Sequence, residues 1–207
     1  MDSIQSQVQR RIASKGRGNV FTPKDFLDVG GRDAIDQALG RLVRSDFIHR
    51  VGRGLYHFPR HNPRIGIDVP ASVDDLAHAL GRQTGSTVAP SGAVAANRLG
   101  LSTQVPAVPV YLSNGRSRTA VVGNTTIQIK HVAPKLLPPG RPMSAVVFQA
   151  LTYLGREAID DSVIRAIRKR LTPSQRRQLL RDARYATGWI AGVARRIAGD
   201  SAEGPAG

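Results

Sequence analysis

The sequence contains no cysteine, and this absence removes several kinds of chemistry at once. Without thiols there is no disulfide framework, no thiolate nucleophile and no cysteine-based zinc site, and a cytosolic protein fits best. Long apolar runs are also missing, because no stretch approaches the roughly 20 apolar residues of a membrane span. The N-terminal segment MDSIQSQVQRRIASKG lacks the apolar centre of a signal peptide. We therefore expect a cytoplasmic protein with no membrane partner.

Acidic residues are scarce. The chain has 15 Asp and Glu against 30 Lys and Arg, a formal net charge of +15. Such a field favours polyanions, so nucleic acid is the leading class of partner. The alternative is a protein that is basic only because arginine dominates its composition, and charge alone does not decide between the two. With 41% hydrophobic residues in 207, the chain is long enough for one large or two small folded domains.

The motifs of common enzymes are missing as well. There is no Gly-x-Ser-x-Gly elbow, no His-Glu-x-x-His pair and no P-loop, and the five histidines are scattered. TGSTVAPSG superficially resembles the Gly-Ser segment of a nucleotidyltransferase, but no Asp-x-Asp pair follows to hold two metal ions. We expect no catalytic site, no metal and no cofactor.

The first part of the chain carries clear helical patterns. Ile4, Val8 and Ile12 recur at helical spacing before SKGRGN interrupts them. VFTP then reads as a short extended piece, after which Thr22 can cap a second, short helix that ends at DVGG. A third helix is expected from residue 32 to about residue 45, with one apolar stripe: Ile35, Ala38, Leu39, Leu42 and Val43.

The stretch DFIHRVGRGLYHFP follows directly and reads as two short apolar runs joined by a Gly-Arg-Gly tip. Helix, short helix, glycine turn, helix and hairpin is the order of a winged helix-turn-helix, whose third helix reaches into a major groove. Arg32, Gln37 and Arg41 have the chemistry to read bases, since arginine pairs bidentately with guanine and glutamine with adenine. In the hairpin, Arg53 would lie at the tip beside the duplex, with His49 and Arg50 near phosphates.

A different reading of the same segment stays open. Winged helices also serve as protein-interaction modules, and the two glycines of the turn are needed for positive φ whatever the arginine does. Asp33 and Asp36, on the third helix, would repel phosphate.

The rest of the chain predicts a second domain, so that the whole is of the α+β class. We expect a winged helix-turn-helix over residues 1–67, a mixed α/β domain over residues 68–200 and a disordered tail over residues 201–207. Residues 68–70 read as a linker. SVDDLAHALGRQTG is an expected helix, STVAP a strand, and VPVYLS and TAVVGNTTIQIKHV consecutive strands around Asn-Gly and Gly-Asn turns. From residue 144 onward helical patterns dominate.

This helical end contains a dense set of cations with few acids between them. Apolar residues at helical spacing place the cations on outward faces, where they would ordinarily be a solvated surface. A second surface for a polyanion or an acidic partner is the alternative. Its candidate residues are Arg165, Arg168, Lys169, Arg176, Arg177 and Arg181.

Two stretches in succession carry a family resemblance. GNVFTPKDFLDVGGRDAIDQALGRLVRSDFIHRVGRGLYHFPR resembles the N-terminal domain of AbiEi-family antitoxins, and STVAPSGAVAANRLGLSTQVPAVPVYLSNG with SRTAVVGNTTIQIKHV is similar to their second domain. The resemblance spans about residues 18–131 and implies the antitoxin of a type IV toxin-antitoxin pair. Such a protein counteracts a nucleotidyltransferase toxin and represses its own operon by binding inverted repeats in promoter DNA.

The resemblance also assigns roles to residues. It implies that Arg32, Gln37 and Arg41 read bases, and that phosphates are held by Lys24, Arg44, Arg50 and Arg53. Two other functions stay open: a winged-helix transcription factor that responds to a ligand and has no antitoxin role, and a protein-binding adaptor with an incidental basic surface.

Overall fold

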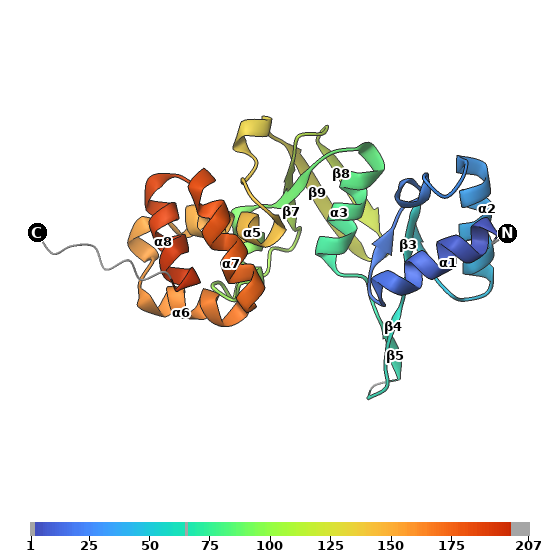
Figure 1. Ribbon diagram of the computed structural model, residues 1–207, viewed down its shortest axis with the longest axis horizontal. Helices are drawn as coiled ribbons and strands as arrows, with labels where there is room; N and C mark the ends of the chain where they lie inside the picture. The colour runs from blue at the N-terminus through green and yellow to red at the C-terminus, as the bar shows by residue number, and fades with distance from the viewer. Residues whose placement is uncertain (1–2, 65, 200–207) are drawn as a thin grey trace, which may run out of the picture. The chain divides into compact units, whose positions relative to one another are not determined.

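The fold is α+β, as expected from the sequence. The computed structural model describes residues 3–64 and 66–199 (Figure 1). The chain divides into two compact units: unit 1 comprises Met1–Val88 and Ser113–Ile129, and unit 2 comprises Ala89–Leu112 and Lys130–Gly207. The expected boundary between residues 67 and 68 stays a prediction, and the expected tail over residues 201–207 lies outside the described residues.

Unit 1 begins with a winged helix-turn-helix. Its elements, in chain order, are α1 (Ile4–Lys15), β1 (Val20–Phe21), η1 (Pro23–Phe26), α2 (Arg32–Arg44), β2 (His49–Gly52) and β3 (Leu55–His57). The three strands form an antiparallel sheet in the order β1-β3-β2, so the expected extended piece VFTP contributes a strand to the wing sheet. The expected short helix is a single 3₁₀ turn, η1, rather than an α-helix.

Local sequence explains where these helices begin and end. Ser3 caps α1 by accepting a hydrogen bond from the Ser6 amide at 3.1 Å, and Gly16, with φ of 85°, ends it. At η1 the proline at the first position needs no amide partner, and the Asp25 carboxylate accepts a hydrogen bond of 2.8 Å from the Thr22 amide.

The core of this winged helix forms where α1, η1, α2 and the wing sheet meet. The apolar stripe of α2 is fully buried at Ile35, Leu39 and Leu42, none of them more than 1% exposed. Each such side chain contributes about 1.5–3 kcal/mol on burial. Cations reinforce the rim: Arg11 pairs with Asp28 at 2.6 Å, joining α1 to the segment after η1.

Further elements complete unit 1. They are β4 (Arg60–Asn62), β5 (Ile67–Val69), α3 (Val73–Thr84), β8 (Arg118–Val122) and most of β9 (Thr125–His131). β4 and β5 form an antiparallel hairpin that extends away from the rest of unit 1 (Figure 1). Residues 68 and 69, expected in a linker, are therefore strand residues, with Asp68 opposite His61 and Val69 opposite Arg60.

The strands of the second expected region are present. β8 and β9 pair antiparallel through the Gly-Asn turn, from Arg118 opposite Ile129 to Val122 opposite Thr125. The sheet that contains them has the order β6-β7-β9-β8, with β6 (Val88–Pro90) and β7 (Val110–Ser113).

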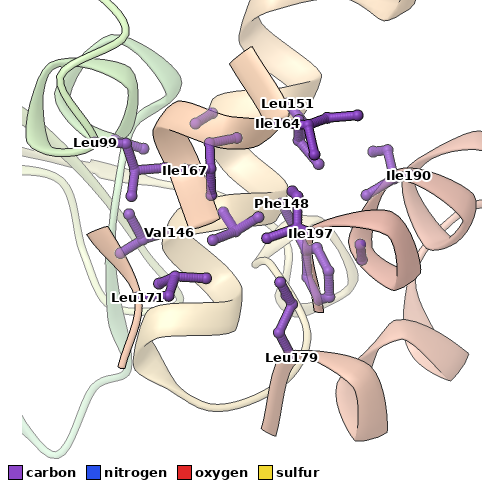
Figure 2. Close-up of a cluster of buried hydrophobic side chains, with 14 of the residues drawn as sticks. Leu99, Val146, Phe148, Leu151, Ile164, Ile167, Leu171, Leu179, Ile190 and Ile197 are labelled. Carbon is purple, nitrogen blue, oxygen red and sulfur yellow. The ribbon is translucent and has the colours of Figure 1, made fainter. Parts of the chain in front are cut away.

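Unit 2 is mainly helical, again as the sequence predicts. Its helices are α4 (Gly92–Arg98), η2 (Pro134–Leu136), α5 (Pro142–Leu154), η3 (Arg156–Ala158), α6 (Asp161–Arg170), α7 (Pro173–Asp182), η4 (Ala183–Tyr185) and α8 (Gly188–Ala198). Figure 2 shows the core between them, built around Phe148 and Leu151 of α5 and Ile167 of α6. α4 lies very close to α5, since a Cβ on Gly92 would lie 2.4 Å from Cβ of Tyr153.

A buried carboxylate fixes the start of α5. Asp182, at the end of α7, is only 6% exposed and accepts hydrogen bonds from the Arg141 amide at 3.0 Å and from Nε2 of Gln178 at 2.8 Å. Burial pushes the pKa of Asp182 upward, but these bonds and one from Ser144 outweigh it and hold the pKa below its usual value. The charged carboxylate therefore stabilises the fold of unit 2.

None of the helices in the described part of the chain is long and apolar enough to cross a membrane.

Candidate nucleic-acid interface

A basic hollow of about 670 Å³ lies between η1, α2 and the wing. Its charged lining comes from Lys24 of η1, Arg32 and Asp36 of α2, Arg50 of β2 and Arg53 of the wing tip. Four of the eight residues predicted to contact DNA are thus brought together from three elements of the winged helix. Through its side chain, none of Lys24, Arg50 and Arg53 forms a hydrogen bond or ion pair with another described residue. Three cations are therefore available to phosphate.

The remaining predicted residues of α2 lie outside this lining. Gln37, Arg41 and Arg44 are exposed on the helix. Arg32 is exposed too, but its Nε donates a hydrogen bond of 2.7 Å to Oδ2 of Asp36 one turn along the helix. An exposed pair of this kind contributes only about 0.3–0.5 kcal/mol to the helix. Its larger effect is on charge, because Asp36 partly neutralises the one arginine at the N-terminal end of α2.

The wing tip is a tight turn at residues 52–54. Gly54 has φ of +65°, which favours glycine, and the pairing of β2 with β3 shifts register between Arg50 and Gly52. Arg53 is exposed at this tip. His49 is only half-buried, and its Nε2 lies 3.1 Å from Oδ1 of Asp46; it does not line the basic hollow.

The structure adds contacts that the sequence did not predict, made by the end of α3. Nε2 of Gln83 donates hydrogen bonds to the wing-tip carbonyl oxygens of Arg53 and Gly54, at 2.8 and 3.0 Å. The neighbouring Arg82 bonds to Asp25 at 2.9 Å and to the Val20 carbonyl at 2.7 Å. We call Arg82 and Gln83 the α3 clamp, because they tie a helix outside the winged helix to η1, β1 and the wing tip.

A comparison with known protein families assigns the chain to one of them. The profile of DUF6088, a family of unknown function, matches residues 7–179. The chain belongs to this family. The match includes every residue of the basic hollow and of the α3 clamp. No curated protein matches the sequence.

The second basic surface of this DUF6088 protein lies on two successive helices of unit 2. Arg165, Arg168 and Lys169 are exposed on α6; on α7, Arg177 and Arg181 are exposed and Arg176 is half-buried. Cations in the last turn of a helix interact favourably with its dipole, which gives Arg168 and Lys169 a structural role in α6. None of the six forms an ion pair with an acid among the described residues. Their excess positive charge thus remains at the surface.

The described part of this DUF6088 protein holds no group of three or more His, Asp or Glu side chains arranged to hold a metal ion.

Proposed function

We propose that this DUF6088 protein is a sequence-specific DNA-binding repressor of its own operon, and the antitoxin of a type IV toxin-antitoxin pair. One observation carries the DNA-binding half: η1, α2 and the wing direct four cations into one hollow beside the exposed face of α2. A net charge of +15 supports the same partner. Support for the antitoxin half comes from the resemblance of residues 18–60 and 86–132 to AbiEi-family antitoxins.

In this proposal α2 enters the major groove and the wing lies against the neighbouring backbone. Gln37 and Arg41 read base edges, as the most exposed polar residues of the middle of α2. Lys24, Arg50 and Arg53 bind phosphates, and Arg44 contacts the backbone at the far end of the helix. Arg32 contributes least of the cations, because Asp36 already balances its charge.

The partner on the antitoxin side is a nucleotidyltransferase toxin, counteracted in the cytoplasm. The operator contains inverted repeats, and two copies of α2 read its two halves. The antitoxin role predicts that co-expression of the chain restores growth to cells that carry the toxin of its operon.

A gel-shift titration tests DNA binding. The full chain is titrated against DNA from upstream of its own gene, with a scrambled duplex of equal length as competitor and with salt varied. A specific repressor keeps its complex in the presence of competitor and shows a steep salt dependence. Equal loss of binding on both duplexes would reject sequence recognition and favour the adaptor.

Two variants separate the roles of the residues. Arg53→Ala should weaken binding by about 1 kcal/mol and lower the salt slope by about one unit, since one phosphate contact is lost. Arg41→Ala should instead relax sequence preference. Equal falls in specific and nonspecific affinity would show that Arg41 contacts the backbone.

A further inference from the structure

A second hollow of about 530 Å³ lies in unit 1, between the end of α3 and the segment that leads into β8. We call it the arginine hollow. Two cations line it, Arg116 and Arg118, and none of the described residues in its lining is acidic. The lining also contains four hydroxyl side chains: Thr84, Ser86, Ser113 and Ser117.

Arg118 is a cation that the fold holds in place. It is half-buried in β8, and its Nη2 donates a hydrogen bond of 2.5 Å to the carbonyl oxygen of Leu80 in α3. It forms no ion pair with an acid among the described residues. A guanidinium carries five N–H donors, and a carbonyl oxygen does not neutralise its charge. Arg118 is therefore oriented by α3 and still has donors and charge for an anion.

Arg116 adds a second positive charge to the same hollow. Its side chain is exposed and forms no hydrogen bond or ion pair with a described residue. Arginine stays protonated at all ordinary pH values, so both side chains are charged and repel each other. An anion between them would remove this repulsion. The charges of the hollow therefore favour an anionic ligand.

The hydroxyl groups make phosphate the most suitable anion. Oγ1 of Thr84 lies 3.0 Å from Oγ of Ser86 and 3.1 Å from the carbonyl oxygen of Gly81. The two hydroxyls carry two protons and the carbonyl accepts one of them, which leaves one proton for a ligand. A phosphate group has enough oxygens to accept from two guanidinium forks and a hydroxyl together, and arginine binds phosphate in a bidentate manner.

The end of α3 joins the arginine hollow to the DNA-facing surface. Thr84 lines both the arginine hollow and the basic hollow. One turn of the same helix holds Arg118 through the Leu80 carbonyl and holds the wing tip through Gln83, which donates to the Arg53 carbonyl at 2.8 Å. Residues three apart on a helix are roughly 4.5 Å apart along its axis. This spacing is of the same order as the rise of about 3.4 Å per phosphate along one DNA strand.

We propose that the arginine hollow binds a phosphate of the DNA backbone, next to the phosphate held at the wing tip, through Arg116 and Arg118. The DNA-contacting surface thus extends beyond the winged helix to the segment between β7 and β8. This inference rests on the proposed DNA-binding function and adds residues to it.

Arg116→Gln tests the contact, because the side chain of Arg116 has no bond that supports the fold. The full chain is titrated by fluorescence anisotropy with operator DNA and with a scrambled duplex, at several salt concentrations. The Kd should rise about three- to ten-fold on both duplexes, and the salt slope should fall by about 0.9 unit. Arg156→Gln is the matched control, because Arg156 of η3 is an exposed arginine of unit 2 without a bond to a described residue. It should leave the slope unchanged.

The position of the contact is tested on operator duplexes in which single phosphates are replaced by neutral methylphosphonates. Replacing a contacted phosphate should weaken binding of the natural chain. It should have no further effect on the variant that lacks the contacting side chain. The position to which Arg116→Gln is insensitive should neighbour the position to which Arg53→Ala is insensitive.

The outcomes separate this inference from the proposed function. An unchanged Kd and slope for Arg116→Gln, with Arg53→Ala impaired, would overturn the DNA contact while the repressor function stands. Weaker binding of Arg116→Gln without any insensitive position would also overturn it, because the arginine would then act only through long-range attraction. Failure of the natural chain to bind either duplex would reject the DNA-binding function and this contact together.

Discussion

The α3 clamp predicts that a residue with no charge and no expected DNA contact controls the affinity for DNA. Gln83→Ala removes two hydrogen bonds, at 2.8 and 3.0 Å, from the wing-tip carbonyls of Arg53 and Gly54. Each neutral hydrogen bond of this kind contributes about 0.5–1.5 kcal/mol net. Without them the tip must be ordered when DNA binds, and fixing one residue of backbone costs about 1–2 kcal/mol.

These terms give an expected loss of about 1–2 kcal/mol in DNA binding. The Kd should therefore rise roughly five- to thirty-fold. Because Arg53 still reaches its phosphate in the complex, the salt slope should stay unchanged, unlike the slope of Arg53→Ala. The assay is fluorescence anisotropy with operator DNA at several salt concentrations.

Gln104→Ala is the matched control, because Gln104 is exposed and its side chain has no hydrogen bond to a described residue. A Gln83→Ala variant that binds like the natural chain, while Arg53→Ala is impaired, would refute the role of the clamp. A fall in its salt slope would show instead that the phosphate contact itself had been lost.

Three further predictions follow from charge and packing. Asp36→Asn should tighten DNA binding and steepen the salt slope by up to about 0.9 unit, because it frees Arg32; salt titrations measure both. Asp182→Asn should lower the free energy of unfolding by about 2 kcal/mol at pH 7 in a denaturant titration. The pKa of Asp182 in the folded chain lies below its ordinary value of 3.8. The carboxylate therefore makes its full contribution to the free energy of unfolding above pH 3.8, and this contribution declines as the pH falls below 3.8. The difference in stability between Asp182→Asn and the natural chain should shrink accordingly in acid. Gly92→Leu should cost about 1–3 kcal/mol, seen as a lower Tm, by forcing α4 away from Tyr153.

The buried ring of His57 predicts a second pH dependence of stability, at a higher pH than that of Asp182. The pKa of His57 in the folded chain is lowered from 6.5, so the unfolded chain binds a proton more readily. The neutral ring therefore makes its full contribution to the free energy of unfolding above pH 6.5. This contribution declines as the pH falls from 6.5 towards the pKa of His57 in the folded chain. Denaturant titrations from pH 7.5 to 5 should show this decline, and His57→Phe should reduce it. Equal pH dependence of the two chains would contradict the neutral buried ring.

Much of the fold could be predicted from local signals. The proline after Thr22, the apolar stripe from Ile35 to Val43 and the Gly-Arg-Gly turn predict the winged helix, because caps, periodicity and turns act over a few residues. The sequence does not indicate the 3₁₀ character of η1, which follows from its length, since a helix of only four residues leaves little room for i→i−4 hydrogen bonds. The β4–β5 hairpin is not predicted, because Asp68 and Pro70 are typical of a linker. Asp68 is instead in β5, where it lies opposite His61 of β4.

The site was predictable only in part, because its geometry depends on distant residues. The sequence indicated which cations belong to the winged helix, but not that Lys24, Arg50 and Arg53 share one hollow while Arg41 lies outside it. It gave no signal for the α3 clamp, since Gln83 and Arg53 are 30 residues apart and a glutamine near a helix end has many ordinary roles. Periodicity likewise cannot show that the ring of His57 is left with an unpaired nitrogen.

Unit 1 is built from two separate stretches of the chain, which restricts how recombination can exchange it between genes. Its two stretches, Met1–Val88 and Ser113–Ile129, are interrupted in the gene by codons that belong to unit 2. A recombination event with one breakpoint cannot move unit 1 without also moving residues of unit 2. A cut after the wing leaves behind the glutamine that holds the wing tip, a cut after α3 leaves behind the β8–β9 turn, and a cut after β9 carries residues 89–112 of unit 2 along. We therefore expect recombination to exchange these genes as whole reading frames rather than to shuffle the DNA-facing part alone onto new partners.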